Sequence, residues 1–415
     1  MQMYCFLEQV DPGQHDAFVQ TNAMCNLLQS ASWAKVKENW DHAIVAVKEG
    51  DHLVASALVL IKRLPLHFTM FYIPRGPVMD YQNKELVCFF MKHLQRWAKK
   101  HHCLFIKMDP GIHYRDYLLE EKEEAQVHEE IAQILENMKE AGAIHQGLSL
   151  SIKDSIQPRF QANVYKEENI RELFSKHARK GLSIAEKKHV QIRLCGEEAV
   201  ARFAQVLHCT EERKGISLRD QEYFKKLLEA YPNDSIICLA VLPVRKLYEE
   251  SVQKLNANEQ ELAACPENAK KKRFTLEEQH SSYTREVSEL KELLEKNGEE
   301  ITIAGGLCIK YGHTAELLYA GMDERFKRYM PSYAVFTACM EWGFESGCDY
   351  YNMGGIEGSL QDGLTKFKAN FHPHINEFIG EFDLPVSHLL YHASQKAYTI
   401  RKRRMLQHNE EETNE

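Results

Sequence analysis

The segment from residue 244 to residue 300 places the strongest constraint on the fold of this 415-residue chain. Runs typical of β-strands lie directly before and after it, at 236–242 and 301–309. Within the segment, apolar residues recur at the spacing of a coiled-coil seam: Tyr248, Val252, Leu255, Leu262, Leu276, Tyr283, Val287, Leu290 and Leu294. Pro266 interrupts the pattern where the chain must turn back. We predict an antiparallel coiled-coil arm inserted between two neighbouring strands, either as a solvated stalk or as an arm for a large partner.

The length and composition of the chain exclude several classes of protein. A hydrophobic content of 44% over 415 residues is enough for two cores. The net charge of −8 argues against a general nucleic-acid coat, although local basic patches remain compatible with it. The 11 cysteines form no C-x-x-C pair, and neither a secretory signal nor a long apolar span is evident. These features predict a cytoplasmic protein with reduced thiols and no metal site.

Outside the arm, the same order of elements occurs twice. In each copy, extended runs that include a β-hairpin precede an amphipathic helix and a strand that ends at a polar break. The first copy comprises 43–61, 68–73, 83–101 and 103–108, and the second comprises 236–242, 301–320, 332–346 and 348–353. This repetition predicts an α/β (α+β) fold with two similar domains that face each other across a binding cleft.

The sequence also suggests where the domains begin and end. We assign residues 1–155 to the first domain, 156–243 and 301–382 to the two parts of the second, 244–300 to the arm, and 383–415 to a C-terminal helix and disordered tail. A basic run at 396–404 is either a solvated helix end or a contact with an anionic membrane face.

Several candidate site residues follow the ends of predicted strands. Asp109 ends a buried strand before a proline, where it either caps the loop or takes part in chemistry. Gly354 and Gly355 allow the backbone to approach a ligand closely. Lys368 lies in the following loop, where it could neutralise a phosphate or a developing oxyanion. No Walker A, Rossmann, G-x-S-x-G or H-E-x-x-H motif is present, so these residues alone do not identify a reaction.

Other candidates are cationic. Lys37 lies between two tryptophans in a short helical pattern that is either a packed amphipathic helix, which the residues alone favour, or the edge of an anion site. A basic stretch at 176–193 is either a solvated face or a phosphate contact, and it contains Lys176, Arg179, Lys180, Lys187 and Lys188. The predicted turn of the arm carries Lys270, Lys271, Lys272 and Arg273, which form a second possible phosphate contact.

Taken together, these segments resemble the Fem family of aminoacyl-tRNA-dependent peptidoglycan bridge transferases. The resemblance covers nearly the whole chain and includes the arm at the family's position. The residues that carry it lie at 33–40, 75–81, 108–110, 156–159, 219 with 223–224, 319–321, 354–357 and 366–368.

The resemblance implies a fold, a reaction and a set of site residues. Each half should be a domain similar to an acetyltransferase (GNAT) domain. The donor should be an aminoacyl-tRNA, and the acceptor a stem-peptide amine of lipid II or UDP-MurNAc-pentapeptide, at the inner membrane face. Lys368, which follows Phe367, matches the lysine of the family that takes part in the transfer step. Asp109 matches a residue of the family that lies near the reacting amine. The residues matched to substrate binding are Lys37, Arg219, Arg75, Gly76, Tyr319, Gly354, Gly355 and Tyr223.

The implied chemistry requires no cofactor besides the aminoacyl-tRNA co-substrate. An aminoacyl ester is already activated, so aminolysis depends mainly on positioning. The attacking amine must be neutral, which desolvation or transfer of its proton to Asp109 could achieve. Lys368 could then stabilise the tetrahedral intermediate.

Two alternatives remain at this stage. One is a coenzyme A-dependent N-acyltransferase, although the R/Q-x-x-G-x-G/A pyrophosphate loop is not found. The other is a non-enzymatic adaptor that uses the coiled-coil arm as its working surface. The sequence also leaves open whether Gly, Ala or Ser is transferred, which acceptor is used, whether the first or a later bridge residue is added, and the oligomeric state.

Overall fold

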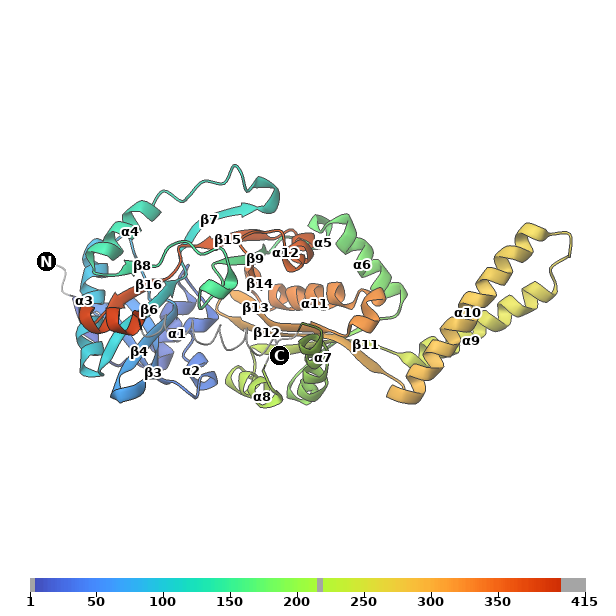
Figure 1. Cartoon of the computed structure of the whole chain (residues 1–415), viewed down its shortest axis with the longest axis horizontal. Helices are drawn as coiled ribbons and strands as arrows, with labels where there is room; N and C mark the ends of the chain where they lie inside the picture. Colours follow the sequence, from blue (N-terminus) through green and yellow to red (C-terminus); the bar gives the residue numbers. More distant parts are fainter. Residues whose placement is uncertain (1–3, 215–218, 397–415) are drawn as a thin grey trace.

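The computed structural model describes residues 4–214 and 219–396, which form two eight-stranded sheets with helices packed on them and a long helical arm (Figure 1). The first sheet has the order β1-β2-β3-β4-β6-β16-β8, with β5 paired to β3. Its strands are β1 (Tyr4–Leu7), β2 (Asp41–Glu49), β3 (His52–Arg63), β4 (Thr69–Arg75), β5 (Val78–Met79), β6 (Cys103–Pro110), β8 (Ile144–His145) and β16 (Phe382–Pro385).

The first half contains several helices, of which α3 (Lys84–Lys100) corresponds to the helix predicted at 83–101. They are α1 (Pro12–Gln20), α2 (Trp33–Val36), α3 (Lys84–Lys100) and α4 (Ile131–Glu140). Helix α3 begins after Asn83, whose side chain accepts a hydrogen bond from the Leu86 N–H group. Its apolar face, which includes Phe90 and Trp97, is buried against the first sheet, because these residues recur at helical spacing.

The second sheet has the order β10-β11-β12-β13-β14-β9-β15-β7. Its strands are β7 (His113–Leu118), β9 (Phe160–Tyr165), β10 (Gln191–Cys195), β11 (Ser235–Leu242), β12 (Ile301–Tyr311), β13 (Thr314–Met322), β14 (Tyr350–Ile356) and β15 (His374–Phe378). Its helices are α5 (Ile170–Leu173), α6 (Lys176–Lys187), α7 (Val200–Lys214), α8 (Gln221–Ala230), α11 (Pro331–Glu345) and α12 (Gly363–Lys368). The expected α/β class is confirmed, and the predicted hairpins and closing strands are present in both halves.

The two halves exchange strands. β7 follows the first-half strand β6 in the chain but pairs with β15 in the second sheet. β16 comes after the second half in the chain but pairs with β6 and β8 in the first sheet. Sheet membership therefore does not follow the boundaries that we drew at 155 and 382, because strand periodicity alone does not reveal which sheet a strand joins.

The two parallel strand pairs differ in how far they stay together. In the first sheet, β4 and β6 remain paired up to Arg75 and Pro110. In the second sheet, β13 and β14 are paired only from Thr314 to Glu316, opposite Tyr350 to Asn352. The pairing with β13 therefore ends before β14 reaches Gly354 and Gly355.

The predicted arm is present as two antiparallel helices, α9 (Val244–Ala263) and α10 (Lys270–Asn297), which project from the end of the second half (Figure 1). Leu276 and Leu290 are buried along their seam. Asn258 is also buried and donates a hydrogen bond to the Leu276 carbonyl group. The helices meet at the base, where the Arg245 N–H group bonds the Glu299 carbonyl group.

The C-terminal part that the structure describes is a strand followed by a helix. β16 ends at Pro385, and residues 388–396 are helical. Tyr391 of this helix is buried against Leu104 and Phe105 of β6. The predicted tail and all of the basic run after Lys396 lie outside the described residues. Among the residues that are described, no helix is long and apolar enough to cross a membrane.

Candidate functional site

Asp109 lies near the end of β6 and is only 3% exposed. One carboxylate oxygen accepts a hydrogen bond from the Arg75 backbone N–H group at 2.7 Å, and the other accepts one from the Tyr72 hydroxyl group at 2.9 Å. Burial raises the pKa of Asp109 to about 6, although Arg75 and these hydrogen bonds act in the opposite direction. The carboxyl group is therefore poised to exchange a proton near neutral pH.

Arg75 joins the two halves beside Asp109. Its backbone has a φ of 51°, which an L residue rarely adopts, and its side chain is 1% exposed. The guanidinium group donates a hydrogen bond to the Pro158 carbonyl group at 2.6 Å and lies over the Phe378 ring. Its Nε atom has no hydrogen-bond partner among the described residues. The neighbouring Gly76 is required by packing, because a Cβ atom there would lie 2.7 Å from the Gln29 side chain.

A small cavity of about 30 Å³ opens beside these residues. It is lined by Arg75, Asp109, Gln146, Gly147, Ser149, Asp154, Ser155, Gln157, Arg159, Phe378, Gly380 and Glu381. The Ser155 hydroxyl group, like the Nε atom of Arg75, is buried without a partner in the described structure. A cavity lined by three carboxylates, two guanidinium groups and unsatisfied donors suits a polar or cationic ligand group rather than an apolar one.

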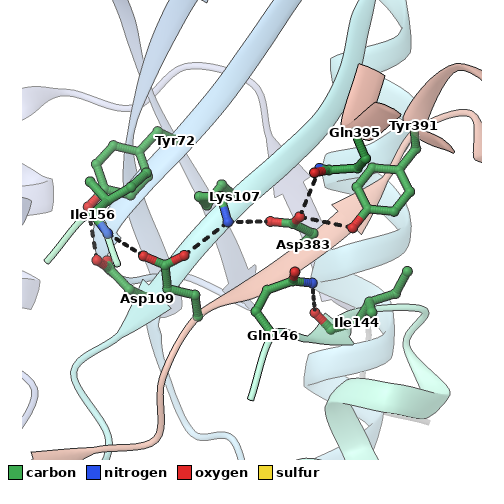
Figure 2. A network of polar contacts seen from close by, with 10 residues as sticks. Tyr72, Lys107, Asp109, Ile144, Gln146, Ile156, Asp383, Tyr391 and Gln395 are labelled. Atoms are coloured by element: carbon green, nitrogen blue, oxygen red, sulfur yellow. Dashed lines mark hydrogen bonds and ion pairs between the residues drawn. The ribbon is translucent and has the colours of Figure 1, made fainter. Parts of the chain in front are cut away.

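Glu381 was not singled out from the sequence, and a polar network holds it in place (Figure 2). Lys107 bridges Glu381 and Asp383 at 3.0 and 2.8 Å. Burial alone would lower the pKa of Lys107, but the two carboxylates outweigh it and raise that pKa. Glu381 accepts a further hydrogen bond from the Ile156 N–H group, and Asp383 accepts one from the Tyr391 hydroxyl group. The network thus fixes the Glu381 carboxylate on the wall of the cavity that Asp109 also lines.

Lys368 is the last residue of α12, and it is 4% exposed. The helix begins after Asp362, whose carboxylate caps the first N–H groups. Lys368 donates a hydrogen bond from Nζ to the Gly355 carbonyl group at 3.0 Å. Gly354 has a φ of 86°, and a Cβ atom on it would lie 3.6 Å from this ammonium group. The glycines therefore bring the backbone of β14 directly to Lys368.

Phe367 faces the hydrophobic core. Its ring lies 5.1 Å from that of Tyr333, 5.0 Å from that of Phe336 and 5.4 Å from that of Phe371. This aromatic cluster anchors α12 on α11 and so fixes the neighbouring Lys368. The structure thus gives Phe367 a packing role next to the predicted transfer lysine.

The predicted residues Lys368 and Asp109 are connected through a short series of contacts. A Cβ atom on Gly355, the residue that Lys368 bonds, would lie 2.3 Å from the Pro158 ring. The Pro158 carbonyl group accepts the hydrogen bond from Arg75, whose N–H group bonds Asp109. The two residues come from different halves, and the loop that contains Pro158 lies between them.

A second cluster brings together the residues predicted to bind an anionic substrate. The Lys37 ammonium group lies 5.0 Å from the centre of the Trp33 ring, and the Arg219 guanidinium group lies 5.0 Å from that of Tyr223. The Tyr223 and Tyr319 rings are 6.0 Å apart. Burial and the charge of Arg219 lower the pKa of Lys37. Two cations held close enough that Arg219 lowers the pKa of Lys37 form a site suited to an anion such as a phosphate.

The two predicted tRNA contacts differ in their surroundings. The cations of α6 and its C-terminal end, Lys176, Arg179, Lys180, Lys187 and Lys188, are all exposed. This helix begins after Ser175, which bonds Asn370 just beyond Lys368, and at its other end Lys188 pairs with Glu286 of the arm. At the arm tip, Lys270 and Lys271 are exposed, but Lys272 pairs with Glu261 and Arg273 with Glu277. Compared with the arm tip, the helix α6 therefore lies closer to the candidate site and carries more positive charge outside the ion pairs described above.

Sequence reasoning also missed Glu316 of β13. This residue is 8% exposed, and burial raises the pKa of its carboxyl group to about 7 against the opposing effects of Arg75 and a Leu27 backbone hydrogen bond. Within a strand, a single glutamate gives no signal of burial, so only the position of Glu316 at the end of the paired part of β13 reveals it. Among the described residues, no cluster of three or more His, Cys, Asp or Glu side chains suits a metal ion.

Comparison with known proteins places this geometry in a family. The model of the FemAB family matches residues 10–399. The lipid II:glycine glycyltransferase of Staphylococcus epidermidis is 27% identical over 402 residues, covering 92% of this chain and 93% of that protein. Aminoacyltransferase FemA of Staphylococcus aureus is 27% identical over 391 residues, covering 89% and 91%. The crystal structure of FemX matches with a TM-score of 0.74 at 25% identity, covering 94% and 99%. The chain belongs to the FemAB family.

Proposed function

We propose that this protein transfers glycine, alanine or serine from aminoacyl-tRNA to the stem-peptide lysine amine of a peptidoglycan precursor, with lipid II as the preferred acceptor. The observation that carries the proposal is the junction between the halves, where a series of contacts links Lys368 to Asp109 and a polar cavity opens beside Asp109 and Arg75. The names of the relatives, a lipid II:glycine glycyltransferase and an aminoacyltransferase, support the same reaction class.

The acceptor amine enters the cavity beside Asp109 and Glu381. An ammonium group is stabilised between two carboxylates, and it must lose a proton before it attacks. Asp109, whose pKa is raised to about 6, is a stronger base than an ordinary carboxylate and accepts this proton. Both carboxylates line the same cavity, so binding and deprotonation take place at one position.

The amine nitrogen then attacks the carbonyl carbon of the aminoacyl ester. The carbon–nitrogen bond forms, the bond between that carbon and the ribose oxygen breaks, and the ribose hydroxyl group of the tRNA leaves with a proton. Negative charge develops on the carbonyl oxygen, and Lys368 stabilises it because the ammonium group is buried and already oriented by Gly355. The reaction forms an amide from an activated ester and needs no other cofactor.

The two substrates bind to different cationic surfaces. Lys37 and Arg219 hold a phosphate of the acceptor precursor, with Tyr223 and Tyr319 beside it. The exposed cations of α6 contact the tRNA backbone, since this helix begins next to the loop that follows Lys368. Transfer to the unmodified stem peptide, which starts the bridge, is the proposed step.

The proposal is tested with purified protein, lipid II and a panel of tRNAs charged with glycine, alanine or serine. We expect a product whose mass exceeds that of lipid II by one amino acid residue, from at least one charged tRNA. Treatment of the tRNA with RNase should abolish it, whereas acetyl-coenzyme A should give no acetylated product. Product formation that survives RNase treatment would disprove the tRNA donor. A parallel assay with UDP-MurNAc-pentapeptide determines which acceptor is preferred.

A further inference from the structure

One edge of the first half exposes large apolar side chains to solvent. Leu66, in the turn between β3 and β4, is 84% exposed, and Leu389, in the helix at 388–396, is 85% exposed. Leu66 and the adjacent His67 have φ angles of 61° and 60°, a region that L residues rarely adopt. The turn therefore holds a leucine outward in a strained conformation, at a position where a polar residue would cost less.

The turn and the C-terminal helix pack against the same buried residues of β6. Leu64 and Phe68, on the two sides of Leu66, pack against the same small cluster as Tyr391, which lies two residues after Leu389. Tyr391 is held by its ring contact with Phe105 and by its hydrogen bond to Asp383. This helix lies at the end of the molecule opposite the arm (Figure 1). The two exposed leucines therefore belong to adjoining elements that are fixed to the same strand.

Basic side chains lie beside the turn that carries Leu66. A groove beside the turn is lined by Leu64, Leu66 and Phe68 together with Arg63, Lys100, His101 and His102. Arg63 pairs with Asp41 and Lys100 pairs with Glu8, yet both cations remain largely exposed. Lys62 adds a further positive charge at the end of β3. Exposed leucines beside exposed cations are suited to the headgroup and acyl boundary of an anionic lipid bilayer.

The same edge leads to the candidate site. The Lys62 ammonium group lies 5.5 Å from the centre of the Trp40 ring, and the Trp40 and Tyr72 rings are 6.3 Å apart. Tyr72 bonds Asp109 directly, and the Trp40 N–H group bonds the carbonyl group of Lys37. A protein docked by this edge would hold both clusters of the site near the lipid headgroups, where the phosphates of a lipid-linked precursor lie.

We propose that the turn at 64–68 and the helix at 388–396 form a docking surface for an anionic lipid bilayer, with Leu66 and Leu389 entering the bilayer. Lipid binding itself is independent of the proposed function. Only the expected increase in activity on a lipid-linked acceptor rests on the proposed function.

Vesicle flotation with the full-length protein tests the proposal. Wild-type protein should float with vesicles that contain phosphatidylglycerol and much less with vesicles of phosphatidylcholine alone, and added salt should weaken the binding. The variant Leu66→Asp/Leu389→Asp should bind at least about tenfold more weakly, because each substitution replaces an inserted apolar group with a charge. Leu194→Asp, at a half-exposed leucine on β10, is the control and should bind like the wild type.

Folding and self-association are checked in the same preparations. Both variants should melt within a few degrees of the wild type, because the replaced side chains are exposed, and both should retain activity on soluble UDP-MurNAc-pentapeptide. The double variant should lose activity only on lipid II in vesicles. The proposal is overturned if the wild type does not float, if the double variant floats equally well, or if the double substitution converts an oligomer into a monomer.

Failure of the proposed function would leave a different pattern. Flotation would then still distinguish the double variant from the wild type, while no acceptor would be modified by any variant.

Discussion

Asp109 combines a hydrogen-bonded position with a pKa of about 6, which links activity to pH. If the carboxylate accepts the proton of the amine, kcat should rise with pH to a plateau, with a midpoint near 6. Asp109→Asn should lower kcat on the order of 10²–10⁴-fold and remove this limb of the profile, because the amide cannot accept the proton. A pH profile of kcat for both proteins measures this, and an unchanged midpoint in the variant would assign the titration to another group.

The buried carboxyl group of Asp109 should also lower the stability of the folded protein. Its pKa is higher in the folded protein than its ordinary value of 3.8, so the native state binds the proton more tightly. The free energy of unfolding therefore falls as pH rises from about 4 to about 6, and the full penalty applies above that window. At pH 7.5, Asp109→Asn should increase the free energy of unfolding by up to about 3 kcal/mol, and the melting temperature should rise with it. At pH 4 the substitution should have little effect on either quantity. A lower melting temperature at pH 7.5 would mean that the hydrogen bonds of the carboxylate outweigh the cost of its burial.

Lys368 offers a second test at the scale of one side chain. The methionine variant Lys368→Met keeps most of the volume but removes the charge, so it should lower kcat by about 10²–10³-fold with a smaller effect on KM. The effect on kcat should exceed the effect on KM because the charge stabilises the intermediate more than it stabilises the bound ground state. Single-turnover measurements with preloaded lipid II separate the chemical step from binding. Full activity in this variant would remove Lys368 from the reaction.

At the scale of elements, the packing of β14 on the loop before β9 should control both stability and transfer. A methyl group at Gly355 would lie 2.3 Å from Pro158, so one of the two must move. Gly355→Ala should destabilise the protein by about 1–3 kcal/mol and lower kcat, because Lys368 bonds the same residue. Gly363→Ala is the control, since no atom lies within 4 Å of the position that its methyl group would take. Thermal melting and steady-state kinetics of both variants would show whether the contact matters.

The elements themselves could largely be predicted from the sequence, whereas their partners could not. The α3 pattern from Leu86 to Trp97 and the hairpin of β2 and β3 follow from local periodicity, which depends on neighbouring residues only. The placement of β7 and β16 in the opposite sheets depends on long-range pairing that leaves no local trace. Glu381 escaped notice for the same reason, because its role depends on Lys107, which is 274 residues away.

For the whole molecule, the arm can be separated from the body more readily than any other part. The seam near the tip is held by Asn258 and Leu276, whereas Leu247 and Leu290 at the base belong to the core of the second half. Replacing residues 256–281 with a short glycine-rich turn should therefore preserve the melting temperature of the body within a few degrees, because it removes contacts within the arm and leaves the base intact. Circular dichroism and thermal melting measure the outcome.

The same truncation distinguishes the two cationic surfaces. Transfer from a short aminoacylated RNA helix should be unchanged if the tRNA acceptor end contacts α6. Arg179→Glu/Lys180→Glu should raise KM for this RNA by about tenfold and reduce the salt dependence of binding, because each lost phosphate contact reduces the release of counterions. Lys92→Glu/Lys99→Glu, at two exposed lysines of α3, controls for the same change in net charge. If the truncation raises KM for full-length tRNA while the α6 variant does not, then the arm tip with Lys270 and Lys271, rather than α6, is the surface that binds tRNA.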